Sequence, residues 1–138
     1  MIKSQILLDI LDLALEGDVD IGLLKKQIPY LTEKSFEYTN IGLYVYFEQD
    51  SSIKNYRIYP NSITSFNQKG DEFYRLDGVE IKNDVQNILA DATVHLTNGL
   101  IDCIEIWNKI GFYPKSELLQ YEIYQNWKLK NRKRIIRK

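Results

Sequence analysis

Polar residues interrupt the apolar start of the chain at helical spacing. Gln5, Asp9, Asp12 and Glu16 are separated by four, three and four residues, so they share one narrow stripe of a helix over residues 2–16. Leucine, isoleucine and alanine fill most of the remaining positions. Since a helix that is apolar on most sides has to be covered on most sides, the pattern predicts a core helix.

A second, shorter helix is predicted to follow. Gly17 is a natural end for the first helix, and Ile21, Leu24 and Ile28 continue a helical period until Pro29 ends it. The acidic stripe of the first helix would be repelled by an anionic lipid surface, which favours packing in a protein core over binding to a membrane.

Beyond Pro29 the period of apolar residues changes from 3.6 to 2, which is the period of β-strands. Besides a hairpin, the strand candidates are residues 41–48, 56–59, 73–81 (interrupted at Asp77-Gly78) and 119–129. No internal repeat or linker divides the chain. The pattern therefore predicts one α+β domain over residues 1–127, in which two N-terminal helices pack on a five- or six-stranded, mainly antiparallel sheet.

Residues 90–107 form the clearest predicted unit, a β-hairpin. Asn98-Gly99 is a favoured sequence for a two-residue hairpin turn, and it sets Thr97 opposite Leu100. Counting outward from this turn predicts, among others, the pairs Val94 with Cys103, Ala92 with Glu105, and His95 with Asp102. The first two pairs would lie on the apolar face of the hairpin and the third on its polar face.

This register makes Glu105 the most informative acid of the chain. It would lie among apolar residues, where a carboxylate needs a partner because an unpaired buried charge is costly. We therefore expect Glu105 to be buried and hydrogen-bonded. Its role would be structural if the partner is a cation such as Arg57 or Arg75, and functional if the partner is a tyrosine hydroxyl or a water in a cleft. Cys103 would lie on the same apolar face as an inert thiol, pointing away from His95.

The residue types that most enzymes need are scarce in the 138 residues. His95 is the only histidine and Cys103 the only cysteine, which excludes an internal disulfide and a zinc site rich in these ligands. The predicted His95–Asp102 pair, with carboxylates nearby, leaves a small hydrolase as a weaker alternative. No phosphate-binding glycine loop is present. We expect a protein without catalytic residues, metal or cofactor, and the single cysteine fits the reducing cytoplasm.

Charge is distributed unevenly, although the formal net charge is only −1. Seven of the 18 basic residues lie in residues 128–138, which hold no acidic residue; the other residues carry the remaining 11 against all 19 acidic ones, a formal charge of −8. A basic C-terminal tail of this kind, with Arg132, Lys133 and Arg134 at its centre, would suit nucleic acid or an anionic surface. The alternative is a solvated extension partly folded back on the acidic body, since domains that bind nucleic acid usually have a basic body as well.

Tyrosine is the other unusual feature of the composition, with ten residues. Tyr44 and Tyr46 share the polar face of one predicted strand, and Tyr124 lies on the even-numbered face of the last one. Tyrosine is favoured at protein interfaces because its ring offers a large rigid contact area with a polar tip. These three side chains are therefore candidate partner-binding residues, with coverage by the N-terminal helices as the alternative.

Short motifs lie in residues 13–31, 38–47 and 94–107. In the second stretch Thr39, Gly42 and Phe47 match a Thr-Gly-Val-Gly-aromatic strand, with Asn40 in place of its first glycine. The third stretch matches a D-G-x-(I/L)-x-x-L-E hairpin at Gly99, Ile101 and Glu105, with Asn98 for the acid and Ile104 for the leucine, and Tyr113-Pro114 follows. With the leucine-rich helix that ends in Glu-Gly-Asp, these motifs resemble those of a group of small bacterial α+β proteins without an established activity.

The resemblance spans roughly residues 13–114, and it implies a fold and an intracellular bacterial setting rather than a reaction. Proteins of this size and style often resemble immunity proteins encoded beside toxins, which act by binding. No catalytic residue carries over. We therefore expect a non-enzymatic protein-binding domain, in its most specific form an immunity-type inhibitor with a basic partner such as a nuclease toxin. Binding of nucleic acid or an anionic surface through the tail is the alternative.

Overall fold

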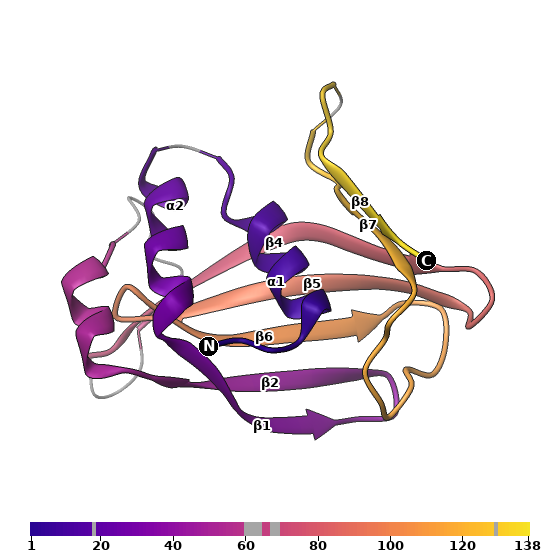
Figure 1. Ribbon diagram of the computed structural model, residues 1–138, viewed down its shortest axis with the longest axis horizontal. Coiled ribbons are helices and arrows are strands. Elements are labelled where there is room, and N and C mark those ends of the chain that lie inside the picture. The colour runs from indigo at the N-terminus through magenta and orange to yellow at the C-terminus, as the bar shows by residue number, and fades with distance from the viewer. Residues whose placement is uncertain (18, 60–64, 67–69, 129) are drawn as a thin grey trace.

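One antiparallel sheet organises the chain, with its helices on one side (Figure 1). The computed structural model describes residues 1–17, 19–59, 65–66, 70–128 and 130–138. Its elements are, in order, α1 (Gln5–Ala14), α2 (Val19–Leu23), the 3₁₀ helix η1 (Leu24–Tyr30), β1 (Leu31–Tyr38), β2 (Gly42–Gln49), the 3₁₀ helix η2 (Ser51–Tyr56), β3 (Ser65–Phe66), β4 (Glu72–Asn83), β5 (Ile88–Thr97), β6 (Leu100–Asn108), β7 (Tyr121–Gln125) and β8 (Arg134–Arg137). None of the described helices has the length and apolar character that crossing a membrane requires.

The strands follow one another across the sheet in the order β1-β2-β6-β5-β4-β7-β8, and β3 pairs with β4. The predicted α+β class with an antiparallel sheet is confirmed, but the described residues form eight strands rather than five or six. β1, β3 and β8 are the strands that the apolar pattern does not predict. β1 has the sequence LTEKSFEY and is exposed along much of its length, so it lacks the alternation by which half-buried strands are recognised.

The other differences from the prediction lie at the ends of elements. The first helix begins later than predicted, at Gln5, and the second helical region divides into α2 and η1, which contains Pro29. Residues 56–59, predicted as a strand, form none: Tyr56 is the last residue of η2, and residues 57–59 are irregular. β7 ends at Gln125, and Leu129, predicted in the same strand, lies outside the described residues.

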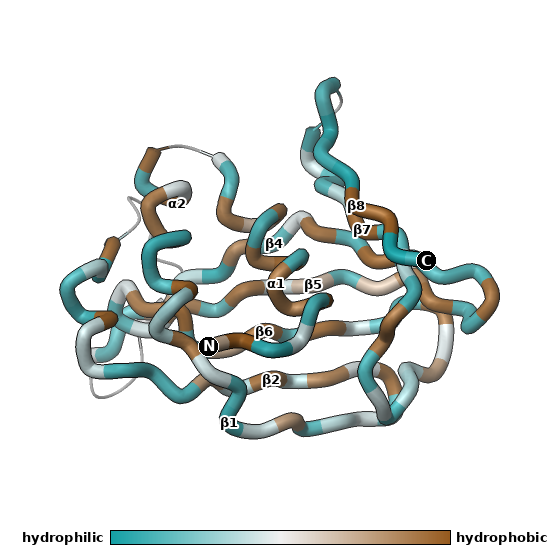
Figure 2. Tube along the Cα trace, viewed as in Figure 1, coloured by the Kyte–Doolittle hydropathy of each residue, from teal (hydrophilic) through white to brown (hydrophobic). Residues whose placement is uncertain are grey.

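The helices and the sheet share one apolar core. α1 contacts β4, β5 and β7, and in Figure 2 apolar residues recur along α1 and along the strands that it crosses. The largest fully buried side chains come from both layers: Leu7, Ile10, Leu11, Leu13, Leu15, Leu24, Leu31, Ile53, Ile81, Ile88, Leu96 and Ile101. Burying a side chain of this size contributes about 1.5–3 kcal/mol, so this packing fixes α1 on one face of the sheet.

Gln27, in η1, is fully buried and joins three segments of the chain. Its side-chain amide donates to the carbonyls of Tyr56 and Gly99, both at 2.9 Å, and its side-chain oxygen accepts from the Ile101 amide at 2.8 Å. These bonds connect η1 and η2 to the turn of the β5–β6 hairpin. The side chain thereby pairs the Tyr56 carbonyl and the Ile101 amide, and it is a second donor to the Gly99 carbonyl, which also accepts from the Ile58 amide at 3.1 Å.

We expect Gln27→Ala to lower the free energy of unfolding by about 2–4 kcal/mol, because each buried polar group left unpaired costs about 1–3 kcal/mol. Urea unfolding followed by circular dichroism measures the change. Lys26→Ala, an exposed neighbour in the same helix, is the control and should change stability by less than about 0.5 kcal/mol. A loss below about 1 kcal/mol for Gln27→Ala would contradict the proposed role of these bonds.

Candidate functional site

The turn of the β5–β6 hairpin forms as predicted. Asn98 and Gly99 have positive φ angles of 51° and 76°, the geometry for which this pair is favoured in two-residue turns. Leu96 lies opposite Ile101, also as predicted. The agreement ends at this pair.

A β-bulge shifts the next pair outward. His95 lies opposite Cys103, which leaves Asp102 as an additional residue on β6. Because side chains alternate between the two faces of a strand, one additional residue moves every later β6 side chain to the other face. All predicted pairs beyond Leu96 and Ile101 are therefore wrong, among them Val94 with Cys103, Ala92 with Glu105, and His95 with Asp102.

The bulge places Cys103, Glu105 and Trp107 on the face of the sheet opposite α1. We call this face the open face; it points away from the viewer in Figure 1. Four neighbouring strands contribute to it with Tyr44, Tyr46, Arg75, Asp77, Asp91, Thr93, His95, Cys103, Glu105 and Trp107. Aromatic and acidic side chains therefore lie side by side on it.

Glu105 forms a hydrogen-bonded group with His95 and Tyr44 on the open face. His95 Nε2 lies 3.0 Å from one carboxylate oxygen of Glu105, and the Tyr44 hydroxyl donates to the other at 3.2 Å. The charge of Glu105 raises the pKa of Tyr44, and burial adds to this effect. Glu105 is half-buried rather than enclosed by the apolar core, and among the described residues neither Arg57 nor Arg75 is its partner.

The predicted His95–Asp102 pair is not formed, because His95 pairs with Glu105. Asp102 accepts a hydrogen bond from the Thr97 hydroxyl at 2.7 Å instead of pairing with His95. Cys103 faces the same side as His95, contrary to the prediction, but it is only 5% exposed and burial raises the pKa of its thiol to about 12. Such a thiol is a poor nucleophile. Within the described part of the chain, no group of three or more His, Cys, Asp and Glu side chains could hold a metal ion.

A hollow of about 520 Å³ opens beside Glu105, and we call it the tryptophan hollow. Its lining consists of Arg75, Asp77, Gly78, Asp91, Thr93, Glu105, Trp107, Asn126 and Trp127. Both tryptophans of the chain are in this lining, 49% and 41% exposed. Three carboxylates face one guanidinium there, so the hollow carries an excess of negative charge.

Gly78 makes room for Trp127, which reaches the tryptophan hollow from the segment after β7. The φ angle of Gly78 is 110°, at a bulge in β4, and a Cβ atom there would lie 2.5 Å from Cε3 of the Trp127 indole. The Asn126 amide donates to the Gly78 carbonyl at 2.8 Å and so fixes the approach. A glycine within a strand pattern indicates that another group approaches the backbone closely, but the sequence does not identify Trp127 as that group.

The three tyrosines predicted to bind a partner differ in how free they are to contact another protein. Tyr44 and Tyr46 lie on the open face with stacked rings, their centroids 6.4 Å apart, so α1 does not cover them. Tyr44 and Trp107 also line an apolar hollow of about 330 Å³ beside the tryptophan hollow. The hydroxyl of Tyr124, in contrast, donates to Glu80, and the Arg132 guanidinium lies 5.0 Å from its ring centre.

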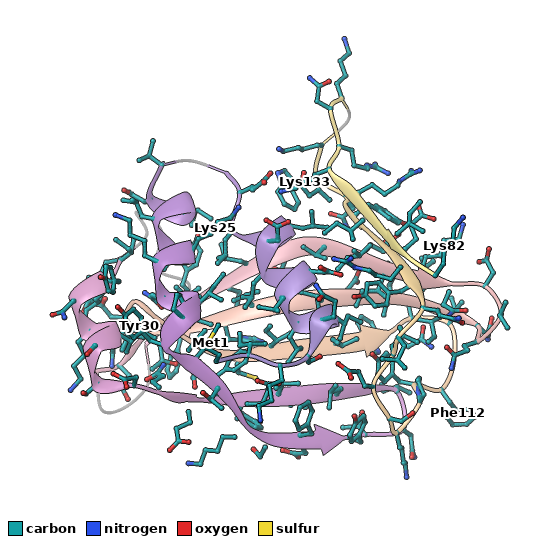
Figure 3. The ribbon with its side chains drawn as sticks, in the orientation of Figure 1. Met1, Lys25, Tyr30, Lys82, Phe112 and Lys133 are labelled. Carbon is teal, nitrogen blue, oxygen red and sulfur yellow. The ribbon has the colours of Figure 1, made fainter. Side chains whose placement is uncertain are left out.

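The basic C-terminal segment folds back on α1. β8 pairs with β7, and Lys133 lies 2.8 Å from Glu16 and 3.2 Å from Asp12. Lys25 also approaches Asp12, to 3.3 Å, so Lys25 and Lys133, both labelled in Figure 3, meet at this acid. The acidic stripe of α1 is thus the docking site of the chain's own basic segment.

Most charges of this segment have partners within the domain. Arg137 lies 2.9 Å from Asp9, which is almost fully buried; burial alone would raise the pKa of Asp9, but hydrogen bonds from Arg137, Tyr121 and Gln5 lower it overall. The basic residues of the segment with such contacts are Lys128, Arg132, Lys133, Arg134 and Arg137. The arrangement corresponds to the folded-back alternative and leaves few cations of this segment for a polyanion.

The Lys133 ion pair predicts a pH dependence of stability. The hydrogen bond from Lys133, helped by a hydrogen bond from Gln125 and by the charges of Lys133 and Lys25, outweighs burial and lowers the pKa of Glu16 from 4.5 to about 2, so folding favours the charged form. The stabilisation is present above pH 4.5 and is lost as the pH falls towards 2. We expect Glu16→Gln to cost about 1–2 kcal/mol at pH 7, after allowance for solvent screening, and almost nothing near pH 2.

Urea unfolding at several pH values measures this difference. The exposed acid Glu48 provides the control, since Glu48→Gln should give a small difference that does not change with pH. A difference for Glu16→Gln that stays constant from pH 7 to about pH 2 would show that the ion pair does not supply the stabilisation.

No family model, curated protein or solved structure matches this chain. The function of the open face has to be inferred from the residues that form it. Those residues are aromatic and acidic side chains around three adjoining hollows, and burial raises the pKa of the Cys103 thiol among them.

Proposed function

We propose that the chain is a non-enzymatic protein-binding domain and that its open face docks a basic partner protein. The observation that carries the proposal is the exposure of large aromatic side chains on a sheet face that α1 does not cover. Trp107 and Trp127 are 49% and 41% exposed, and Tyr46 is 38% exposed. Tyrosine and tryptophan contribute most to binding energy at protein interfaces because they bury much area with few rotatable bonds.

Charge supports a basic partner over an acidic one. The acidic residues Asp77, Glu80, Asp91, Asp102 and Glu105 lie along this region of the sheet, where Arg75, Lys109 and, near Glu80, Arg132 are the neighbouring cations. The basic C-terminal segment places Lys128, Lys133 and Arg137 on the acids of the α1 stripe, on the other side of the molecule, whereas Arg132 lies over the Tyr124 ring near Glu80. A negative face accelerates association with a positive one and disfavours partners of its own sign.

An immunity-type inhibitor is the most specific form of this proposal. A nuclease toxin has to present a basic surface to nucleic acid, and an acidic face with central aromatic side chains is complementary to such a surface. The resemblance of the motifs around Gly42 and Gly99 to small bacterial proteins points the same way. In this form the domain acts by covering its partner, and no residue of the open face performs chemistry.

The test is affinity capture from the native host with three versions of the chain. We expect the wild type and Phe36→Ala to retain the same basic protein, and Tyr46→Ala/Trp107→Ala to lose it. Phe36 is the matched control because it is an exposed aromatic residue that lies opposite the core residue Val45 and so shares the other face. Binding should weaken as salt rises from about 0.05 to 0.5 M, because the attraction is screened.

Three results would overturn the proposal. The first is equal retention of the partner by the open-face variant, provided that circular dichroism shows it to be folded. The second is loss of the partner on nuclease treatment, which would indicate that nucleic acid bridges the two proteins. The third is the recovery of no protein partner at any salt concentration.

A further inference from the structure

We infer that the tryptophan hollow is a binding site for an arginine side chain of the partner protein. The inference rests on the proposed function, since it names the group by which a basic partner would be recognised. It combines three independent features of the hollow: its two indole rings, its carboxylates and its size.

The indole rings favour a cation that is flat. Trp107 enters the hollow from β6 and Trp127 from the segment after β7, and both keep a large exposed area. A cation over the face of an indole is attracted by the negative charge of the ring face, and tryptophan is the best of the aromatic residues for this contact. A guanidinium group adds planar stacking, which the tetrahedral ammonium of lysine cannot provide.

The carboxylates leave acceptor atoms for such a group. Oδ1 of Asp77 accepts from Arg75 at 3.2 Å and from the Thr93 hydroxyl at 2.7 Å, and Oδ1 of Asp91 lies 3.0 Å from Lys109 Nζ. Among the described residues, the Oδ2 atoms of both acids have no comparable contact. A guanidinium has five N–H donors in a fixed fork, which suits carboxylate oxygens presented by different residues.

The size of the hollow and its negative charge suit an arginine side chain. About 520 Å³ is within the range of small-ligand sites and exceeds the needs of one side chain with a few waters. The lining carries three carboxylates against Arg75, so an incoming cation reduces a net negative charge rather than adding to a positive one. The adjoining apolar hollow at Ile41 and Tyr44 would take an apolar residue next to the arginine.

The experiment is a titration of the full-length protein with blocked tetrapeptides that carry leucine next to arginine, lysine, citrulline or glutamate. Because the two tryptophans of the chain both line the hollow, their fluorescence reports on this site and, through Trp107, on the adjoining apolar hollow. We expect saturable changes with the arginine peptide at millimolar concentration, binding at least about fivefold weaker with lysine, and no saturation with glutamate. Citrulline has the shape of arginine without its charge and should bind about tenfold more weakly.

Variants separate charge from shape. Asp77→Asn and Asp91→Asn should each weaken binding of the arginine peptide about fivefold to tenfold, and Glu48→Gln, the matched control on an acid outside this hollow, should leave it unchanged. Trp107→Phe and Trp127→Phe identify which ring responds. Thermal unfolding of each variant establishes that it is folded under the conditions of the titration.

The outcomes distinguish the inference from the proposed function. Equal binding of citrulline and arginine, or unchanged affinity in both Asp→Asn variants, would overturn the inference even if a basic protein is captured through the open face. Saturable binding of arginine in a chain that captures no protein would support the hollow as an arginine site and overturn only the proposed role. No fluorescence response to any peptide would overturn the inference outright.

Discussion

One additional residue on β6 decides what the open face can do. Ile101 lies opposite Leu96 in the core, and Ile104 and Ile106 are also buried in the core. Residues three apart in a regular strand point to opposite faces, so Ile101 and Ile104 share the core only if a bulge intervenes between them. Asp102 is that bulge, and the burial of two isoleucines thereby sends Glu105 and Trp107 to the open face.

The second constraint is electrostatic, and it links the two ends of the chain. α1 carries its acids on one stripe because its other sides are needed for the core, and the basic segment after β7 docks on that stripe. The exchange places Lys128, Lys133 and Arg137 on the helix side of the sheet, while Arg132 and Arg134 contact Tyr124 and Glu122 of β7. It also holds β8 against β7, the strand whose following segment delivers Trp127 to the hollow.

The apolar pattern predicted what depends on short-range spacing. It identified α1, the strand around Val45 and the Asn98-Gly99 turn, because each has its own period or turn chemistry. It missed β1 and β8, because edge strands with charged side chains carry no alternation. The wrong register at Cys103 could have been avoided. The apolar residues change from odd to even positions between Ile101 and Ile104, and this change is visible in the sequence. The placement of Trp107 and Trp127 in one hollow could not be predicted, because it depends on the long-range pairing of β4 with β7.

The outermost strands also decide how another molecule can attach. β1 has Glu33, Lys34 and Glu37 within eight residues, and β8 has Arg134 and Arg137 at its ends. A strand added at either rim would have to strip water from these charges, or break the pair between Arg137 and Asp9, before its backbone could hydrogen-bond. The charged edge strands therefore disfavour the addition of a further strand at either edge of the sheet. This protects the chain from polymerising through its backbone, and recognition then depends on side chains.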